Sequence, residues 1–121
     1  MQPTPQRSET WITGIGIVSS LGDGQEATWR ALQTGHVNVD ETTFAPWMVH
    51  PLVPLELDAQ IPKKGDQRQI QAWQRLGTYA AGLALDSAAS NDNRDTFART
   101  DMLVTYGGGR RALRVRTHRP A

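Results

Sequence analysis

Three histidines and a complete absence of cysteine limit the side-chain chemistry that this 121-residue chain can support. Without a thiol, the chain has no disulfide, no thiolate metal ligand and no cysteine nucleophile of its own. The histidines are scattered along the sequence without the spacing of a metal site, at His36, His50 and His118. We therefore expect each of them to be a surface or loop residue, and we predict no catalytic, cofactor-binding or metal-binding residue in this chain.

Two glycine-rich segments have the composition of phosphate-binding loops. Gly14-Ile-Gly16 begins like a dinucleotide-binding fingerprint, but Ser19 stands where that fingerprint requires glycine or alanine, and no helix is expected to begin there. Gly107-Gly-Gly-Arg110 lacks the Gly-Lys-Ser/Thr ending of a phosphate loop. Neither segment is therefore predicted to be a ligand site, and the glycines of the second are expected to form a tight turn.

The charges are distributed unevenly along the chain. Residues 1–101 contain 8 Lys/Arg and 12 Asp/Glu, a formal charge of −4, whereas residues 102–121 contain 5 arginines and no acid. A basic tail of this kind can bind nucleic acid by neutralising phosphates, but residues 110–119 contain no aromatic side chain that would stack on bases. We therefore do not expect nucleic acid to be a partner.

Composition favours one soluble domain. The chain is 38% hydrophobic and 21% charged, which is typical of a globular protein. Its first nine residues, expected to be disordered, contain no apolar stretch of signal-peptide length, and no run of about 18 apolar residues follows that could span a membrane. The sequence therefore predicts a cytoplasmic protein without a membrane contact.

The predicted elements follow the order of an α/β fold. Residues 10–18 are rich in β-favouring side chains and short enough to be a strand buried on both faces, followed by a glycine turn at residues 21–24. Residues 101–106 are predicted to form a second buried strand. Two helical segments separate these strands, and that order favours α/β architecture.

The first predicted helix covers residues 25–34. Asp23 is expected to cap its N-terminus, and Gly35 is expected to end it in the left-handed conformation. Trp29 and Leu32 lie on one face of this helix and are predicted to pack on the first strand.

Residues 36–66 are predicted to be irregular, because each of their prolines removes an amide donor and disfavours helix in the residue before it. One short strand near residues 53–57 is the exception that we expect.

The second predicted helix is long, from residue 67 to residue 89, with Asp66 as its cap. Gly77 and Gly82 each cost such a helix about 1 kcal/mol relative to alanine, which suggests that a neighbouring backbone approaches closely there. The apolar side chains recur at three- and four-residue intervals, at Ile70, Trp73, Leu76, Ala80, Ala84 and Ala88.

Three segments, in order, resemble parts of one enzyme family. Residues 12–22, Ile-Thr-Gly-Ile-Gly-Ile-Val-Ser-Ser-Leu-Gly, are similar to the first strand and loop of the β-ketoacyl-acyl-carrier-protein synthases, although the family often has proline at the position of Ser20. The alanine-rich residues 68–86 are similar to a helix of that family, and residues 101–109 to the next core strand and its glycine turn. The resemblance covers residues 10–109.

The resemblance implies a thiolase-like layered α/β fold that is usually dimeric. Family members transfer an acyl chain from an acyl carrier protein onto a cysteine and condense it with malonyl-carrier protein after decarboxylation, in fatty acid or polyketide biosynthesis. The family's cysteine, histidines and lysine have no counterpart here. What corresponds is scaffold, namely Gly14, Gly16 and Gly22 at the first turn and Trp73, Tyr79 and Ala84 on the packing face of the long helix.

The last twelve residues depart from the family. Residues 110–121 form a basic tail without acids, which is the composition of out-of-frame translation of GC-rich DNA. We therefore interpret the chain as a truncated N-terminal portion of a synthase, incomplete in fold and inactive alone. The alternative is a non-catalytic interaction module that pairs with a synthase subunit or a carrier protein. A fragment of this kind is predicted to be poorly soluble or only partly ordered.

Overall fold

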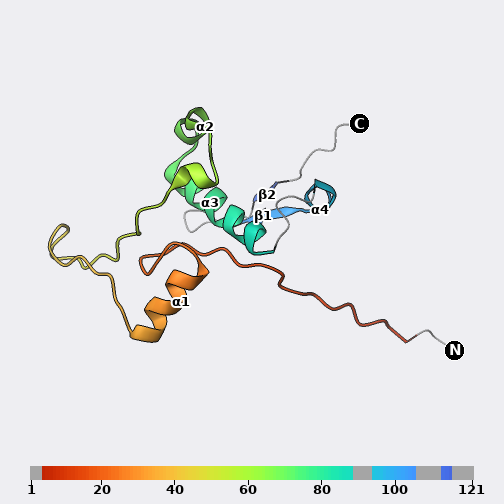
Figure 1. The fold of residues 1–121 in the computed structure, drawn as a ribbon, viewed down its shortest axis with the longest axis horizontal. Helices are drawn as coiled ribbons and strands as arrows, with labels where there is room; N and C mark the ends of the chain where they lie inside the picture. The colour runs from red at the N-terminus through yellow and green to blue at the C-terminus, as the bar shows by residue number, and fades with distance from the viewer. Residues whose placement is uncertain (1–3, 89–93, 106–112, 116–121) are drawn as a thin grey trace.

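The computed structural model of the chain describes residues 4–88, 94–105 and 113–115. Helices predominate, and α3 is the central element (Figure 1). This small mixed set is consistent with an incomplete α/β domain, but the described residues do not form the layered sheet of a thiolase-like fold. The elements in chain order are α1 (Gln25–Thr34), the 3₁₀ helix η1 (Leu57–Ala59), α2 (Lys64–Gln69), α3 (Ala72–Ser87), α4 (Arg94–Ala98), β1 (Met102–Val104) and β2 (Leu113–Val115).

The predicted first strand, residues 10–18, is not a strand in the structure. The segment runs as an open trace past α3 (Figure 1), and only Val18 forms an isolated bridge, with Asp23. A strand needs a backbone partner, and no described segment pairs with residues 10–17. Trp11 and Ile12 are 77% and 84% exposed, so the expected burial on both faces is also wrong.

The second predicted strand is confirmed in part. β1 covers Met102–Val104 and pairs antiparallel with β2, Leu103 lying opposite Arg114. It is not buried, since Leu103 is 73% exposed. The predicted glycine turn at residues 107–109 and the loop near residue 91 lie outside the described residues.

The bounds of α1 are as predicted, because local signals fix both of its ends. Gly35 ends the helix with a φ of 68°, the left-handed conformation that glycine adopts without a steric penalty. The predicted cap is wrong: Gly24 occupies the N-cap position, and no side chain caps the helix. Thr28 Oγ1 instead donates a hydrogen bond of 2.8 Å to the carbonyl oxygen of Gly24.

The predicted packing face of α1 is also wrong. Trp29 and Leu32 are 60% and 59% exposed, whereas Thr28 and Ala31 are buried. Among the described residues no strand lies beside α1 to cover these two large side chains, and the small residue Ala27 faces Gly22 in the turn that precedes the helix.

The predicted long helix is two helices. Ile70 and Gln71 are extended and separate α2 from α3. The amide of Gln71 donates a hydrogen bond of 2.7 Å to Oε1 of Gln74, so the box that caps α3 lies at these glutamines and not at Asp66.

The glycines of α3 do not mark the close approach that we expected. A Cβ atom added at Gly77 would meet nothing within 4 Å, and one at Gly82 would meet the side chain of Gln60 rather than a backbone. The backbone that does approach α3 closely belongs to residues 10–18, which we call the N-terminal segment. It contacts the helix at Ala80 and Ala84.

The stretch between α1 and α2 is largely irregular, as predicted. The strand expected near residues 53–57 is absent, and η1 begins at the end of that range. Farther out, a loop is closed by two hydrogen bonds between Asp40 and Val49, of 2.7 and 3.0 Å.

The core is small. Among the described residues only three apolar side chains are buried, those of Ala31, Ile61 and Tyr79. The accessible surface of the chain is 10803 Å², against roughly 6,500 Å² for a compact protein of this mass. Large apolar side chains are therefore left in contact with solvent along most of the described chain.

Candidate functional site

The N-terminal segment lies against α3 through two glycines. A Cβ atom at Gly16 would overlap the carbonyl oxygen of Ala80 and lie 2.6 Å from the amide nitrogen of Ala84. One at Gly14 would overlap the carbonyl oxygen of Ala84 and lie 2.8 Å from Cβ of Ala88. The segment therefore runs antiparallel to α3, in backbone contact with it.

This contact excludes the dinucleotide interpretation of Gly14-Ile-Gly16. A phosphate-binding glycine loop leads into a helix N-terminus, whose amides point at the ligand. Here the space beside both glycines is filled by the middle and end of α3. The two glycines are scaffold residues, as the resemblance implied.

The spacing of this contact is visible in the sequence, although it was not predicted. Two residues of extended chain advance by about 6.6 Å, and four residues of helix rise by about 6 Å. Glycines two apart therefore match alanines four apart on a helix. Ala80, Ala84 and Ala88 have that spacing. The sequence signal for this contact is therefore glycine at every second residue of a strand-like segment together with alanine at every fourth residue of a helix.

The turn that follows is held by its own backbone. The amide of Gly24 donates a hydrogen bond of 2.9 Å to the carbonyl oxygen of Ile17, and the amide of Ser19 one of 3.1 Å to that of Gly22. Gly22 is buried, and a Cβ there would lie 2.6 Å from Cβ of Ala27 on α1. The turn therefore fixes the start of α1 relative to the N-terminal segment.

A tyrosine joins this turn to α3. Tyr79 is 3% exposed, and its hydroxyl donates a hydrogen bond of 2.8 Å to Oδ2 of Asp23. Burial, together with the neighbouring carboxylate of Asp23, raises the pKa of Tyr79 to about 12. Asp23, expected to cap α1, instead acts as the acceptor that orients this tyrosine.

We expect the ionisation of Tyr79 to weaken the contact between the turn and α3. Its pKa is higher in the folded chain than in the unfolded chain, so its stabilising contribution is complete below pH 10 and is lost as the pH rises toward 12. Tyr79→Phe removes the hydrogen bond at any pH, at a cost of about 1.5 kcal/mol. The difference in tyrosinate absorbance between the wild type and Tyr79→Phe gives the pKa, and a midpoint near 10 would contradict the buried hydrogen bond.

Trp73, the third scaffold residue assigned to α3, does not belong to the packed face. It is 41% exposed, and its indole nitrogen donates a hydrogen bond of 2.7 Å to Oε1 of Gln71. Tyr79 and Ala84 do lie in the contact, so two of the three expected packing residues are confirmed.

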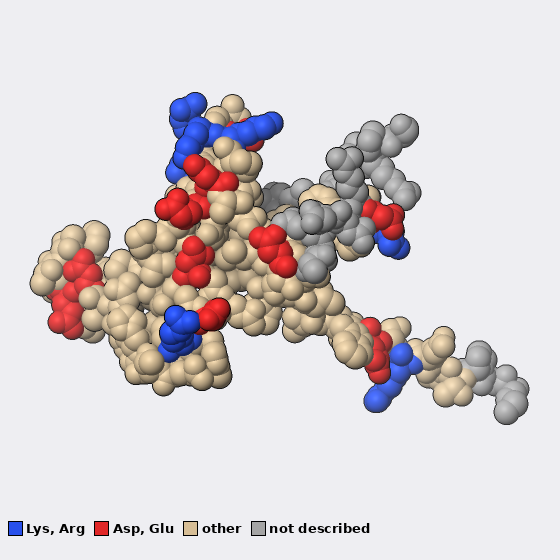
Figure 2. Space-filling view, in the orientation of Figure 1, with Lys and Arg blue, Asp and Glu red and all other residues tan. Residues whose placement is uncertain are grey.

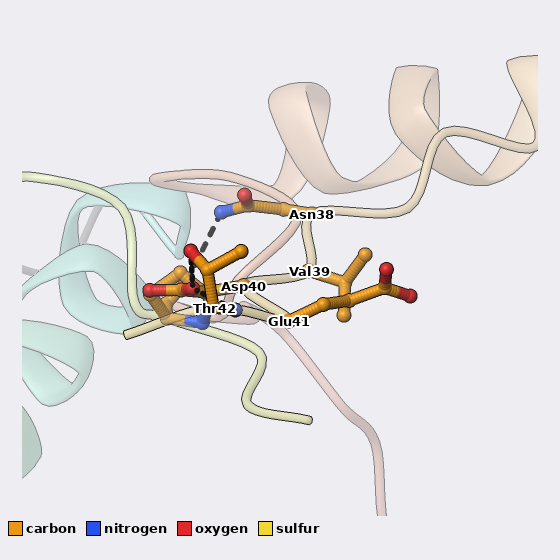
Figure 3. Close-up of a pocket in the computed structure, with 6 residues that line it drawn as sticks. Asn38, Val39, Asp40, Glu41 and Thr42 are labelled. Carbon is orange, nitrogen blue, oxygen red and sulfur yellow. Dashed lines mark hydrogen bonds between the residues drawn. The ribbon is translucent and has the colours of Figure 1, made fainter. Parts of the chain in front are cut away.

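An open depression lies beyond the turn, at the start of the loop between α1 and η1 (Figure 3). Oδ1 of Asp40 accepts hydrogen bonds from the amides of Thr42 and Thr43, at 3.0 and 2.9 Å. Hydrogen bonding lowers the pKa of Asp40 to about 2, with the largest contribution from the hydroxyl of Thr43 and smaller ones from the two amides. A carboxylate with so low a pKa is a weak base, and its hydrogen bonds stabilise the loop. The lining residues are Asn38, Val39, Asp40, Glu41, Thr42 and Pro51.

Protonation of Asp40 is expected to loosen this loop. Its pKa is lower in the folded chain, so its contribution is present above about pH 4 and is lost as the pH falls toward 2. The amide proton shifts of Thr42 and Thr43 should titrate together over that range, and Asp40→Asn should abolish the titration. A midpoint near 4 would show that the hydrogen bonds do not form in solution.

The two described histidines are both exposed. Nδ1 of His50 lies 2.8 Å from the carbonyl oxygen of Asn38. His118 lies outside the described residues. Within the part of the chain that the structure describes, no three potential metal ligands lie together.

Positive charge gathers over α2 (Figure 2). The helix carries Lys64 and Arg68, and Lys63 precedes it. Lys64 pairs with Asp58 at 2.6 Å, whereas Lys63 and Arg68 make no ion pair with a described residue. An anionic group could bind here without breaking an existing pair.

No described helix has both the length and the apolar character needed to cross a membrane. The features that the described residues do provide are the glycine contact with α3, the turn before α1, the charged cluster on α2 and an exposed apolar surface.

Comparison with known proteins finds similarity to one kind of enzyme. No family model and no solved structure matches the chain. The 3-oxoacyl-[acyl-carrier-protein] synthase 2 of Vibrio cholerae serotype O1 is 28% identical over 104 residues, and the synthase of the same name from Vibrio harveyi is equally similar. The aligned region covers 81% of this chain and 25% of each relative. The chain thus spans about a quarter of the length of the curated relatives that it matches.

Proposed function

We propose that this chain is the opening segment of a 3-oxoacyl-[acyl-carrier-protein] synthase. The observation that carries the proposal is the similarity to two such synthases over 81% of the chain. The contact of Gly14 and Gly16 with α3 supports it, because an apolar segment lying flat on a helix is the unit from which a layered α/β domain is built.

The role of these residues in such an enzyme is structural. Decarboxylative condensation of an acyl thioester with malonyl-carrier protein needs a thiolate nucleophile and donors that stabilise the developing oxyanion and enolate. The chain has no cysteine, and its resemblance to the family assigns no catalytic role to any of its histidines. It would therefore contribute the packing of the first turn on α3, in an enzyme of fatty acid or polyketide biosynthesis, and would be inactive by itself.

A graft experiment tests this proposal. The aligned quarter of the Vibrio cholerae synthase is replaced by residues 10–109 of this chain, and decarboxylative condensation by the purified graft is measured. We expect activity in the graft and none in the isolated chain. A soluble, folded graft without activity would contradict the proposal.

An acyl carrier protein is the proposed partner. The phosphopantetheine arm that carries the acyl chain is attached through a phosphate, and the cluster of Lys63, Lys64 and Arg68 offers positive charge to such an anion. In the active graft, the double variant Lys63→Glu, Arg68→Glu should raise KM for the carrier-protein substrate about tenfold at low salt and less at high salt. Arg30→Glu, an exposed arginine on α1, is the control and should leave KM unchanged.

The second hypothesis, an interaction module, predicts a self-standing folded unit. The small core does not favour it, since only three apolar side chains are buried among the described residues. A stable, compact monomer that co-purifies with a synthase or a carrier protein would favour the module instead.

A further inference from the structure

The side chain of Gln60 lies on α3 in a space that Gly82 leaves open. A Cβ atom added at Gly82 would overlap the carboxamide of Gln60, so a larger residue there would push this side chain off the helix. One turn farther along α3, Oδ2 of Asp86 accepts a hydrogen bond of 2.7 Å from Nε2 of Gln60. We call these three residues the glutamine socket. Because glycine is a poor helix former, the socket gives a reason for its presence within α3.

Gln60 directly follows η1, and η1 is linked by side chains to the helix that carries the basic cluster. Oδ1 of Asp58, in η1, accepts hydrogen bonds of 2.6 Å from Nζ of Lys64 and from Nε2 of Gln67, both on α2. Nε2 of Gln67 also donates a hydrogen bond of 2.6 Å to the carbonyl oxygen of Ile61. η1 and α2 therefore form one unit, and Gln60 joins this unit to α3.

α2, which lies beyond the start of α3 (Figure 1), is tied to that helix at two separate points. One is the peptide chain itself, because α2 leads through the extended residues Ile70 and Gln71 into α3. The other is the socket, where Gly82 lies ten residues beyond Ala72, about 15 Å along the helix. A unit held at two distant points keeps its direction, whereas one held only through two extended residues can turn about them.

Resting on the proposed function, we infer that Gln60 is a positioning residue for the acyl carrier protein. Seated in the socket, it fixes the direction in which α2 presents Lys63 and Arg68 to the phosphate of the carrier's arm. Gln60 acts through α2 and not by touching the phosphate. A cluster that points in the binding direction for only part of the time binds more weakly by that fraction. Loss of the socket should therefore raise KM for the carrier protein and leave kcat unchanged.

The test uses the active graft and two variants that empty the socket in different ways. Gln60→Ala removes the side chain that occupies the socket, and Gly82→Ala fills the space that this side chain needs. Each should raise KM for the carrier-protein substrate about threefold, with kcat unchanged. Because both remove the same contact, the double variant should raise KM no further than either single variant. With acyl-pantetheine, which has neither the phosphate nor the carrier protein, KM should not change, whereas a general loss of structure would raise it.

Gly77→Ala is the matched control, because it is the same substitution in the same helix and its Cβ meets nothing within 4 Å. It should leave KM for the carrier protein unchanged. The isolated 121-residue chain gives a second readout of the same contact. The NMR amide shifts of residues 63–68 should change alike in Gln60→Ala and Gly82→Ala, and should stay at the wild-type positions in Gly77→Ala.

An unchanged KM in Gln60→Ala and Gly82→Ala, in a graft where Lys63→Glu, Arg68→Glu raises it, would overturn this inference and leave the proposed function standing. Additive effects of the two socket variants would overturn it as well, because they would then remove different contacts. So would amide shifts of residues 63–68 that ignore both variants. An inactive graft, or an active one whose KM ignores the cluster variant, would count against the proposed function and would overturn the inference with it.

Discussion

Gly16→Val is expected to release the N-terminal segment from α3. The new Cβ would overlap the carbonyl oxygen of Ala80 and crowd the amide of Ala84. Both are backbone atoms of a helix and cannot rotate away as a side chain can. We expect a cost of about 3 kcal/mol, the upper end for overpacking, which shifts the docking equilibrium about 100-fold.

The measurement is the NMR shift of the alanine methyl groups that face the segment, those of Ala80, Ala84 and Ala88. In Gly16→Val these shifts should match a variant that lacks residues 1–17, in which nothing covers that face of α3. Far-UV circular dichroism should show α3 intact, because the substitution lies outside the helix. Shifts that remain at the wild-type positions would mean that the glycine contact does not exist.

Gly77→Ala is the control within the same helix, and it should have the opposite sign. A Cβ there meets nothing within 4 Å, so only the helix propensity changes. We expect a gain of about 1 kcal/mol in helix stability. Sequence reasoning assigned close contact to Gly77 and Gly82, and the paired variants separate that expectation from the contact at Gly16.

The features that could be predicted from the sequence are those that a few neighbouring residues determine. α1 has its predicted bounds because Gly24 and Gly35 fix its ends within one turn each. The irregular stretch before α2 follows from its prolines. β1 lies within the predicted range of residues 101–106 because its apolar residues are consecutive, although it is shorter than predicted and not buried.

The wrong predictions depended on partners that the described residues do not supply. Residues 10–18 have strand composition, but among the described residues only Val18 pairs, in an isolated bridge with Asp23. Trp29 and Leu32 lie on one face of α1 as expected, yet no described strand covers that face and both side chains stay more than half exposed. Periodicity indicates which face is apolar and does not indicate what covers it.

The break before α3 has a different cause. An apolar period continues from Ile70 to Ala88, so the pattern alone predicts one helix. The hydrogen bond from the amide of Gln71 to Gln74 starts a new helix within that pattern. A capping box formed by Gln71 and Gln74 is a weaker sequence signal for a helix start than the Asp66 cap that was predicted. The structure nevertheless starts α3 at the glutamines.

The sequence predicted most of the residues that form the candidate site, but not the contacts between them. Gly14, Gly16 and Tyr79 were named as scaffold from the family resemblance. The two glycines contact the backbone of α3, and Tyr79 of α3 bonds Asp23 in the turn. That Asp23 would bind Tyr79 across 56 positions of sequence could not be predicted, because Asp23 is equally suited to cap the helix that follows it.

Urea unfolding of the isolated chain is expected to be broad and without a cooperative midpoint. A small domain of this length normally unfolds with an m-value of about 1–3 kcal/mol per molar urea, because a shared core becomes exposed at once. Here only Ala31, Ile61 and Tyr79 are buried apolar residues of the described chain, which are too few to form a shared core. We expect an apparent m-value below about 1 kcal/mol per molar, and binding of a hydrophobic dye before urea is added.

The same titration of the synthase graft provides the comparison. If the exposed apolar side chains of residues 11–17 and α1 are covered in the graft, its unfolding should be steep and dye binding should disappear. A steep transition in the isolated monomer would instead show that these residues fold as a self-standing unit, which is what the module hypothesis requires. The m-value therefore separates the two hypotheses, whereas an activity assay of the isolated chain cannot, because both predict that it is inactive.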